Sequence, residues 1–518
     1  MSRPAAAEGT GARAVIERAG RAMHVERLVS HGGLVIDAQG TRDLATLRQG
    51  MQSVQPERSP LATRLAVDLP HRTVAFETNG RINADADEHL RYVFRAGADT
   101  LLVDFLNSRA FGIGPDEQGQ AGRYLATVPH LLIHALLAPP AEAPALSKVA
   151  GEPSTDAVAI AAQWPDGRAL TLLLDRATHY VLAVRTTVDL PVDGPVALTW
   201  TYEAYAEVDG APFPGGHTVS WGGKTYEALQ YRRIALHAPE PPEFSTPPGI
   251  AAPPPPAPSP AQSSASSGPP PSPLLEVRPG IYLFRHARGG FHPLVVAQSD
   301  GLLVVDAPAP WHELSELPPS RSEPGVDSGA VGARLLAALG KHLPDKPVRR
   351  LVLTHEHGDH MGGALPFLDA GIEVVAAPAT RDALAAMLRS RGRDVAAASI
   401  HVVEGRLRVD DATRPVELID VGPNPHADGM LVAYLPNERL LYQSDLFEPL
   451  SPANFPSRPR LPTAQWFTRW LDGSTLAVDE VFAIHGSARV TAEQLDGVRA
   501  SQALELEPRL QRGDLPQL

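Results

Sequence analysis

The pattern of apolar and polar positions divides the chain into two parts with different expected folds. In the first part, apolar residues recur at helical spacing over residues 12–23, which predicts one helix. Short apolar runs then follow one another, separated by turn residues such as the Asp-Gly pair at 209–210, which is typical of a curved antiparallel sheet. The strands predicted in this way are residues 64–68, 73–77, 101–105, 170–174, 181–187 and 197–202. The first part is therefore predicted to be mainly β.

The second part alternates apolar runs with helical segments. Helices are predicted over residues 329–343 and, after a short gap, over residues 361–368. The strands predicted between and before them are residues 280–284, 294–297, 302–306, 348–354 and 373–377, and the run at 302–306 ends in an aspartate. Strands that alternate with helices are typical of an α/β layer architecture.

A proline-rich segment separates the two parts. Residues 247–273 hold 12 prolines among 27 residues, and most of the others are alanine, serine or glycine. Such a segment has too little apolar surface to form a packed core, so we expect an extended spacer. The predicted organisation is a mainly β N-terminal domain at residues 1–246, this linker, and an α/β C-terminal domain at residues 274–518.

Charge and composition exclude several classes of function. The chain of 518 residues carries 46 Lys and Arg against 59 Asp and Glu, a net charge of −13, so it lacks the basic footprint of a nucleic-acid-binding protein. Cysteine is absent, which excludes disulfides, thiolate metal sites and a cysteine nucleophile. We expect no transmembrane segment, because no apolar run reaches about 18 residues. The N-terminal residues lack the apolar core of a signal peptide, which favours the cytoplasm.

The strongest chemical signal directly follows the predicted strand at 348–354. Residues 355–360 read HEHGDH, so three histidines and one aspartate lie within six positions. His355 and His357, two positions apart on an extended turn, are placed to point to one side. Asp359 and His360 then enter the first turn of a helix, where their side chains are expected to face a second metal position nearby. Imidazole and carboxylate are ligands of zinc, and three imidazoles buried together without a metal would be costly, so the motif predicts a metal site.

The motif resembles the hallmark of the metallo-β-lactamase-fold superfamily, and the resemblance covers roughly residues 276–500. It implies an αβ/βα sandwich of two sheets flanked by helices, with three more ligands downstream. His426, Asp445 and His485 occupy the matching places near strand ends, although the family usually has glycine where this chain has Ser444. The resemblance implies two Zn²⁺ ions, held by His355, His357 and His426 on one side and by Asp359, His360 and His485 on the other, with Asp445 bridging them.

Two metals in this arrangement imply a hydrolase. They share a water and lower its pKa toward neutrality, and Asp359 is expected to orient the resulting hydroxide as well as to bind metal. The expected substrate is a small or lipidic ester, lactone, thioester or amide. A bridging aspartate at position 445 argues against the antibiotic-hydrolysing members of the family, which place another residue there.

Two other functions stay open. One is a mononuclear-iron oxidoreductase of the persulfide dioxygenase type, with iron held by His355, His426 and Asp445. The other follows from residues 172–186 and 199–219, which resemble a turn and a hairpin of outer-membrane lipoprotein carrier and sorting proteins. That resemblance implies a lipid-sized apolar cavity, hence a lipid- or peptide-binding protein with a metal-binding passenger domain, and it favours the cell envelope. The compartment and the oligomeric state therefore stay open.

Overall fold

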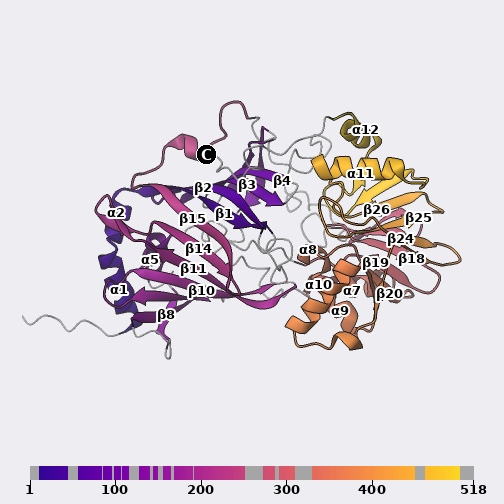
Figure 1. Ribbon diagram of the computed structural model, residues 1–518, viewed down its shortest axis with the longest axis horizontal. Coiled ribbons are helices and arrows are strands. Elements are labelled where there is room, and N and C mark those ends of the chain that lie inside the picture. Colours follow the sequence, from indigo (N-terminus) through magenta and orange to yellow (C-terminus); the bar gives the residue numbers. More distant parts are fainter. Residues whose placement is uncertain are drawn as a thin grey trace, which may run out of the picture.

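The structure is a computed structural model, and it is described here over residues 11–44, 57–83, 86–95, 98–106, 108–115, 128–139, 144–149, 156–164, 169–190, 192–250, 272–285, 291–309, 330–449 and 461–501. An antiparallel sheet with helices makes up the N-terminal part, and a sandwich of two sheets makes up the C-terminal part (Figure 1). The predicted linker lies outside the described residues except for its ends, so the domain boundaries stay a prediction.

The N-terminal sheet agrees with the predicted antiparallel β fold. In the described part of the chain it has 13 strands in the order β6-β5-β4-β3-β2-β1-β15-β14-β11-β10-β9-β8-β7, so most neighbours in space are also neighbours in sequence. A separate hairpin, β12–β13, turns at Asp209 and Gly210, and both have the positive φ that this turn requires. The strands are β1 Gly33–Asp43, β2 Arg58–Asp68, β3 Thr73–Asn83, β4 Ala86–Arg95, β5 Asp99–Asp104, β6 Arg109–Pro115, β7 Ala145–Lys148, β8 Ala157–Gln163, β9 Ala169–Asp175, β10 Val181–Leu190, β11 Gly194–Glu203, β12 Ala206–Val208, β13 Ala211–Phe213, β14 Gly216–Trp221 and β15 Lys224–Ala235.

Helices pack against the N-terminal sheet. The helix predicted at residues 12–23 is present as α1 (Ala12–Ala22), because its apolar side chains lie on one face and share a core with the fully buried Trp200 of β11. Beside α1 lie α2 (Val25–Ser30) and α5 (Pro129–Leu136), and a 3₁₀ turn, η2, follows at Pro241–Phe244. Among the helices of the described residues, none combines the length and the apolar character that crossing a bilayer requires.

The C-terminal part contains the predicted sandwich. One sheet has the strand order β16-β17-β18-β19-β20-β21-β22 and the other the order β23-β24-β25-β26-β27-β28. The strands are β16 Leu274–Arg278, β17 Ile281–Phe284, β18 Leu294–Ala297, β19 Leu302–Val305, β20 Val348–Leu353, β21 Glu373–Ala376, β22 Ile400–Val402, β23 Arg406–Val409, β24 Val416–Asp420, β25 Leu431–Leu435, β26 Leu440–Gln443, β27 Glu480–Ala483 and β28 Arg489–Val490. The helices are α7 Ala330–His342, α8 Gly358–Met361, α9 Leu365–Asp369, α10 Pro378–Ser390, η3 Val395–Ala397, α11 Leu461–Gly473 and α12 Ala492–Ala500.

Strand β19 shows how the layers are built. Leu302 and Val304 join the core beneath α7, whereas Leu303 and Val305 face the second sheet, because successive side chains of a strand point to opposite faces. The first sheet is thus buried on both faces, which explains why its central strands are uninterrupted apolar runs. Figure 1 shows α7, α9 and α10 on one side of the sandwich and α11 and α12 on the other.

The helix predicted over residues 361–368 is not one continuous helix. The structure instead ends α8 at Met361 and begins α9 at Leu365. Gly363 lies between them, and its N–H donates to the carbonyl of Ala307, 2.8 Å away. A side chain at position 363 would meet the Pro308 carbonyl oxygen at 2.6 Å, so the close approach of two backbones requires glycine and interrupts the helix.

One hairpin joins the two parts of the chain. The turn between β10 and β11 reaches the C-terminal end of α10, where the Ser390 hydroxyl donates to the Val192 carbonyl at 3.1 Å and Arg391 Nη2 donates to the Leu190 carbonyl at 2.9 Å. The Val192 side chain packs against the core of the first C-terminal sheet, whereas Leu190 belongs to the N-terminal core. The hairpin therefore connects both cores.

His130 of α5 makes the N-terminal part sensitive to acid. Its ring is fully buried and stacks on Phe213, with ring centroids 3.7 Å apart, and this burial lowers the pKa of His130 to about 3. An unfolded histidine binds a proton near pH 6.5, whereas the folded one stays neutral down to about pH 3. The unfolded state thus binds more protons in this range, so the free energy of unfolding must fall as the pH falls below about 6.5.

We expect acidification from pH 7 to pH 5 to cost the wild-type chain about 2 kcal/mol more than a His130→Phe variant. Thermal unfolding, followed by circular dichroism, measures this. Between pH 7 and pH 5 the midpoint temperature of the N-terminal part should fall by about 4–8 °C more in the wild type than in His130→Phe. His71 is exposed, so a His71→Phe variant should keep the wild-type pH dependence. Identical pH dependence in the wild type and His130→Phe would contradict a buried neutral imidazole.

Candidate metal centre

The candidate metal centre lies where strands of both sheets end. In the first sheet, the parallel strands β19 and β20 are followed by Asp306 and by His355. In the second sheet, the parallel strands β26 and β27 are followed by Asp445 and His485. Parallel strands deliver the residues after them to one edge of a sheet, so segments far apart in sequence meet here. Figure 1 shows the neighbouring helix α8 on the side of the sandwich that faces the N-terminal sheet.

All seven predicted ligands lie at this edge. Their ligand-type atoms form three groups, and within each group these atoms lie within 4.8 Å of one another. The groups are His355, His357 and His426; His355, His360 and Asp445; and Asp359, His360 and His485. The structure therefore brings together every residue that the sequence motif and the family resemblance pointed to.

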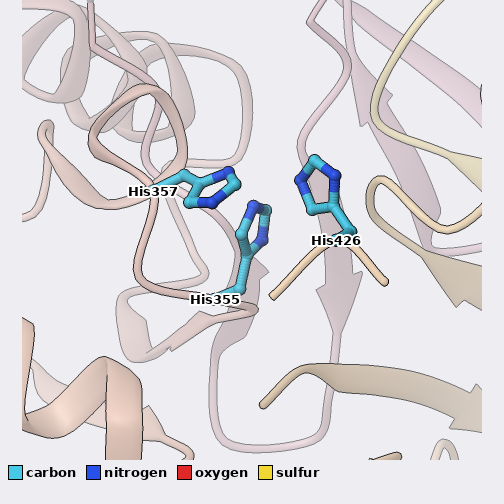
Figure 2. Close-up of side chains that lie close together, drawn as sticks. All are labelled: His355, His357 and His426. Carbon is cyan, nitrogen blue, oxygen red and sulfur yellow. The ribbon is translucent and has the colours of Figure 1, made fainter. Parts of the chain in front are cut away.

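The first group is a compact cluster of imidazole rings. The ring centroid of His357 lies 4.5 Å from that of His355 and 4.6 Å from that of His426. Figure 2 shows the three rings pointing toward one another from two separate segments of the chain. His355 and His357 point to the same side, as the spacing of two positions predicted.

Asp445 lies between the groups. Its Oδ2 atom is 3.2 Å from Nε2 of His426, and its Oδ1 atom is 3.1 Å from Nε2 of His485 and 3.3 Å from Nε2 of His360. One carboxylate thus contacts histidines of both predicted ligand sets, which is the position that a bridging ligand requires.

The electrostatics of the centre favour a bound cation. Burial, followed by the neighbouring His360 and His357, holds the pKa of His355 well below its usual range, so this imidazole is neutral and able to bind a metal. Burial by itself raises the pKa of Asp445, but His360 and His485 outweigh it and hold that pKa well below the usual range. A buried carboxylate that stays ionised needs positive charge around it, and metal ions would supply that charge.

Asp306 is a positioning residue that the sequence analysis did not identify. It is fully buried, and it accepts hydrogen bonds from the backbone N–H of Thr354 at 2.8 Å and from Nδ1–H of His360 at 3.1 Å. Its φ of 67° is unusual for a residue other than glycine, but aspartate tolerates it. The signal in the sequence was the aspartate that ends the apolar run at 302–306.

Thr354 fixes the orientation of His355. Its hydroxyl donates to Oδ2 of Asp306 at 2.9 Å, so its oxygen is left to accept from Nδ1–H of His355 at 3.0 Å. With the proton on Nδ1, the Nε2 atom of His355 presents its lone pair to the centre. Asp306 does the same for His360, so one carboxylate orients two ligands.

Ser444 adds contacts that glycine, usual at this place in the family, would not make. Its hydroxyl donates to Oδ2 of Asp306 at 3.2 Å and lies 3.1 Å from Nδ1 of His360. It also lies 3.3 Å from Oδ1 of Asp445. Ser444 therefore links Asp306 to the carboxylate of Asp445.

The donor set fits a metal ion. In the part of the chain that the structure describes, Nε2 of His355 and Oδ1 of Asp359 are buried without a hydrogen-bond partner. Leaving such atoms unpaired is costly, and a cation at each position would satisfy them. Imidazole nitrogens and carboxylate oxygens suit zinc and iron alike, so the donors by themselves do not choose between these metals.

An aromatic ring closes one side of the centre. The ring of Phe291 meets that of His485 edge-on, with centroids 4.3 Å apart, and lies 5.6 Å from that of His360. Phe291 is buried in the core between the two sheets. This apolar contact excludes water from one side of His485 and lowers the local dielectric constant.

Comparisons with known proteins found similarity over parts of this chain. A curated relative, the 2,4-dinitroanisole O-demethylase subunit alpha of Nocardioides sp. strain JS1661, is 36% identical over 109 residues, which are 21% of this chain and 32% of that protein. The match thus spans about a third of the relative's length. A metallo-beta-lactamase from Pontibacter korlensis is 17% identical with a TM-score of 0.31, covering 44% of this chain and 99% of that one. The metallo-beta-lactamase FIM-1 from Pseudomonas aeruginosa, in its mono-zinc form, is 17% identical with a TM-score of 0.32. That match covers 43% of this chain and 92% of the other chain.

A family model matches much of the C-terminal part. Residues 294–497 match the model of the Metallo-beta-lactamase superfamily, a range that contains all seven predicted ligands. The C-terminal part of this chain is therefore a domain of the metallo-beta-lactamase superfamily.

Proposed function

We propose that the chain is a metal-dependent hydrolase whose centre holds two metal ions. The observation that carries the proposal is the position of Asp445, whose carboxylate contacts His426 through one oxygen and His360 and His485 through the other. In the proposed assignment, His355, His357 and His426 hold one ion, Asp359, His360 and His485 hold the other, and Asp445 bridges them.

The residues of the chain prepare the centre for hydrolysis. When bound, two metal ions polarise the substrate and lower the pKa of a water molecule toward neutrality. Asp359 contributes a buried oxygen, Oδ1, with no hydrogen-bond partner among the described residues, and this oxygen is placed to hold and orient a proton of the attacking water. Asp306 and Thr354 keep the Nε2 atoms of His360 and His355 facing inward, so the ligands need no rearrangement.

The proposed substrates are small or lipidic esters, lactones, thioesters and amides. The Nocardioides relative suggests one more candidate substrate, an activated aryl methyl ether, because that protein is a subunit of a 2,4-dinitroanisole O-demethylase. Hydrolysis of such an ether uses the same attacking water and releases methanol and a stabilised phenolate. The partial similarity supports including 2,4-dinitroanisole in a substrate panel.

Metal content tests the two-ion assignment directly. We expect about two zinc ions per chain in protein purified without added metal, and loss of at least one of them in Asp445→Ala, because the bridging carboxylate contacts both ligand sets. Elemental analysis measures this, with Asp382→Ala as a control, since Asp382 is exposed on α10. About one iron per chain would instead favour the oxidoreductase alternative, and no metal after metal-replete growth would contradict both enzymes.

Activity should depend on the imidazole cluster. On whichever ester, lactone, thioester, amide or aryl ether proves to be turned over, His357→Ala should lower kcat/KM by at least about 100-fold, because a lost ligand costs no less than a lost supporting residue. His401→Ala is the matched control, since His401 is half-exposed on β22. Equal losses in the two variants, or full activity of the chelator-treated chain, would contradict a metal-dependent reaction.

Asp306 should control metal affinity without being a ligand. Asp306→Asn replaces one acceptor oxygen by a donor, so the contacts to Thr354, His360 and Ser444 cannot all be kept. We expect zinc affinity, measured by competition with a chromogenic chelator, to fall by about 10–100-fold, while Asp382→Asn leaves it unchanged. Affinity within twofold of the wild type in a folded Asp306→Asn variant would show that the orienting role is wrong.

A further inference from the structure

A cavity of about 480 Å³ lies on the open seam of the sandwich, and none of the seven predicted ligands lines it. It lies between the two outermost strands of each sheet at this seam, β16 and β17 on one side and β27 and β28 on the other. Its apolar lining includes the buried Leu283 and Phe482 and the side chain of Leu275, which is 41% exposed. This volume is within the range of small-molecule sites.

Positive charge surrounds this apolar lining. Arg278, Arg285 and Arg489 line the cavity, whereas Glu480 is its acidic residue. Glu480 is buried and pairs with Arg278 at 2.5 Å and with Arg489 at 2.7 Å, so it joins the edges of the two sheets. Because each guanidinium has five N–H donors and these two remain about half-exposed, both keep donors for a further acceptor.

We propose that this cavity binds an amphiphilic anion, a molecule with an apolar body and one carboxylate, sulfonate or sulfate group. The apolar body would lie on Leu275, Leu283 and Phe482, and the anionic group would take the open donors of the arginines. Three arginines against one glutamate leave a net positive charge, which selects an anion over a neutral molecule of the same shape.

The same cavity adjoins the backbone that holds a predicted metal ligand. Gly486 and Ser487 line it, and both directly follow His485. Nε2 of His292, another lining residue, lies 3.1 Å from the Gly486 carbonyl, and the Ser487 N–H donates to the Pro449 carbonyl at 2.8 Å. A molecule in the cavity would therefore contact the segment that positions His485, and the proposal includes a coupling of its binding to metal binding.

Calorimetric titration of the full chain, as purified and with its metal content kept, tests the site. The probe is octane-1-sulfonate, which is a poor metal ligand, and octan-1-ol is the neutral comparison. We expect the wild type to bind the sulfonate at one site. The affinity for the sulfonate should fall about fivefold or more in Arg489→Gln, and the wild type should bind the alcohol more weakly than this variant binds the sulfonate. The matched control is Arg408→Gln. Arg408 lies on β23, the opposite edge strand of the same sheet, and pairs with Glu417 of β24, so this variant should bind like the wild type.

Several results would overturn the proposal. Unchanged sulfonate binding in Arg489→Gln would place the molecule elsewhere, and equal binding of the alcohol would show an apolar groove without anion recognition. If circular dichroism shows that Arg489→Gln is unfolded, Leu275→Glu provides a second variant at an exposed position and should weaken binding at least as much.

The coupling has its own readout. Saturating sulfonate should change zinc affinity, measured by chelator competition, about fivefold or more in the wild type and not in Arg489→Gln. Because coupling between two binding sites is reciprocal, zinc should change the affinity for the sulfonate by the same factor. Zinc affinity that is independent of the sulfonate would refute the coupling to His485.

Discussion

A single buried carboxylate, that of Asp306, organises the metal centre. It accepts hydrogen bonds from Thr354 after β20, from His360 in α8 and from Ser444 after β26, and these segments belong to both sheets of the sandwich. A buried carboxylate is stable only where donors satisfy its oxygens, so the strand ends must converge on it. The same hydrogen bonds orient His360 directly and His355 through Thr354, so stability and ligand geometry rest on one group.

The charge balance of the centre follows from the same burial. Asp445 is ionised in a place where burial would otherwise neutralise it, and histidines surround it on both sides. Such an arrangement is stable when positive charge is present, which links folding of this edge of the sandwich to cation binding. The family match over residues 294–497 and the arrangement of donors therefore support the same chemistry from independent directions.

The N-terminal sheet is tied to this domain by a short contact, not by a shared sheet. The β10–β11 hairpin inserts Val192 against the core beneath α10, and Ser390 and Arg391 bind its backbone. The backbone carbonyls of Leu190 and Val192 accept the hydrogen bonds at this contact, and the Val192 side chain adds apolar packing. Such a contact leaves no distinctive residue pattern in the sequence.

The sequence by itself determined the secondary structure of the long apolar runs, the α/β character of the C-terminal part and the metal motif at residues 355–360, because these depend on local spacing. It failed at Met361–Leu365, where the close approach of Gly363 to Pro308 breaks the helix. The family resemblance already named His426, Asp445 and His485, but only the tertiary structure showed how these distant residues reach the motif, because sheet topology brings them to one edge. For the same reason only the structure gave a role to Asp306, whose partners come from three separate segments.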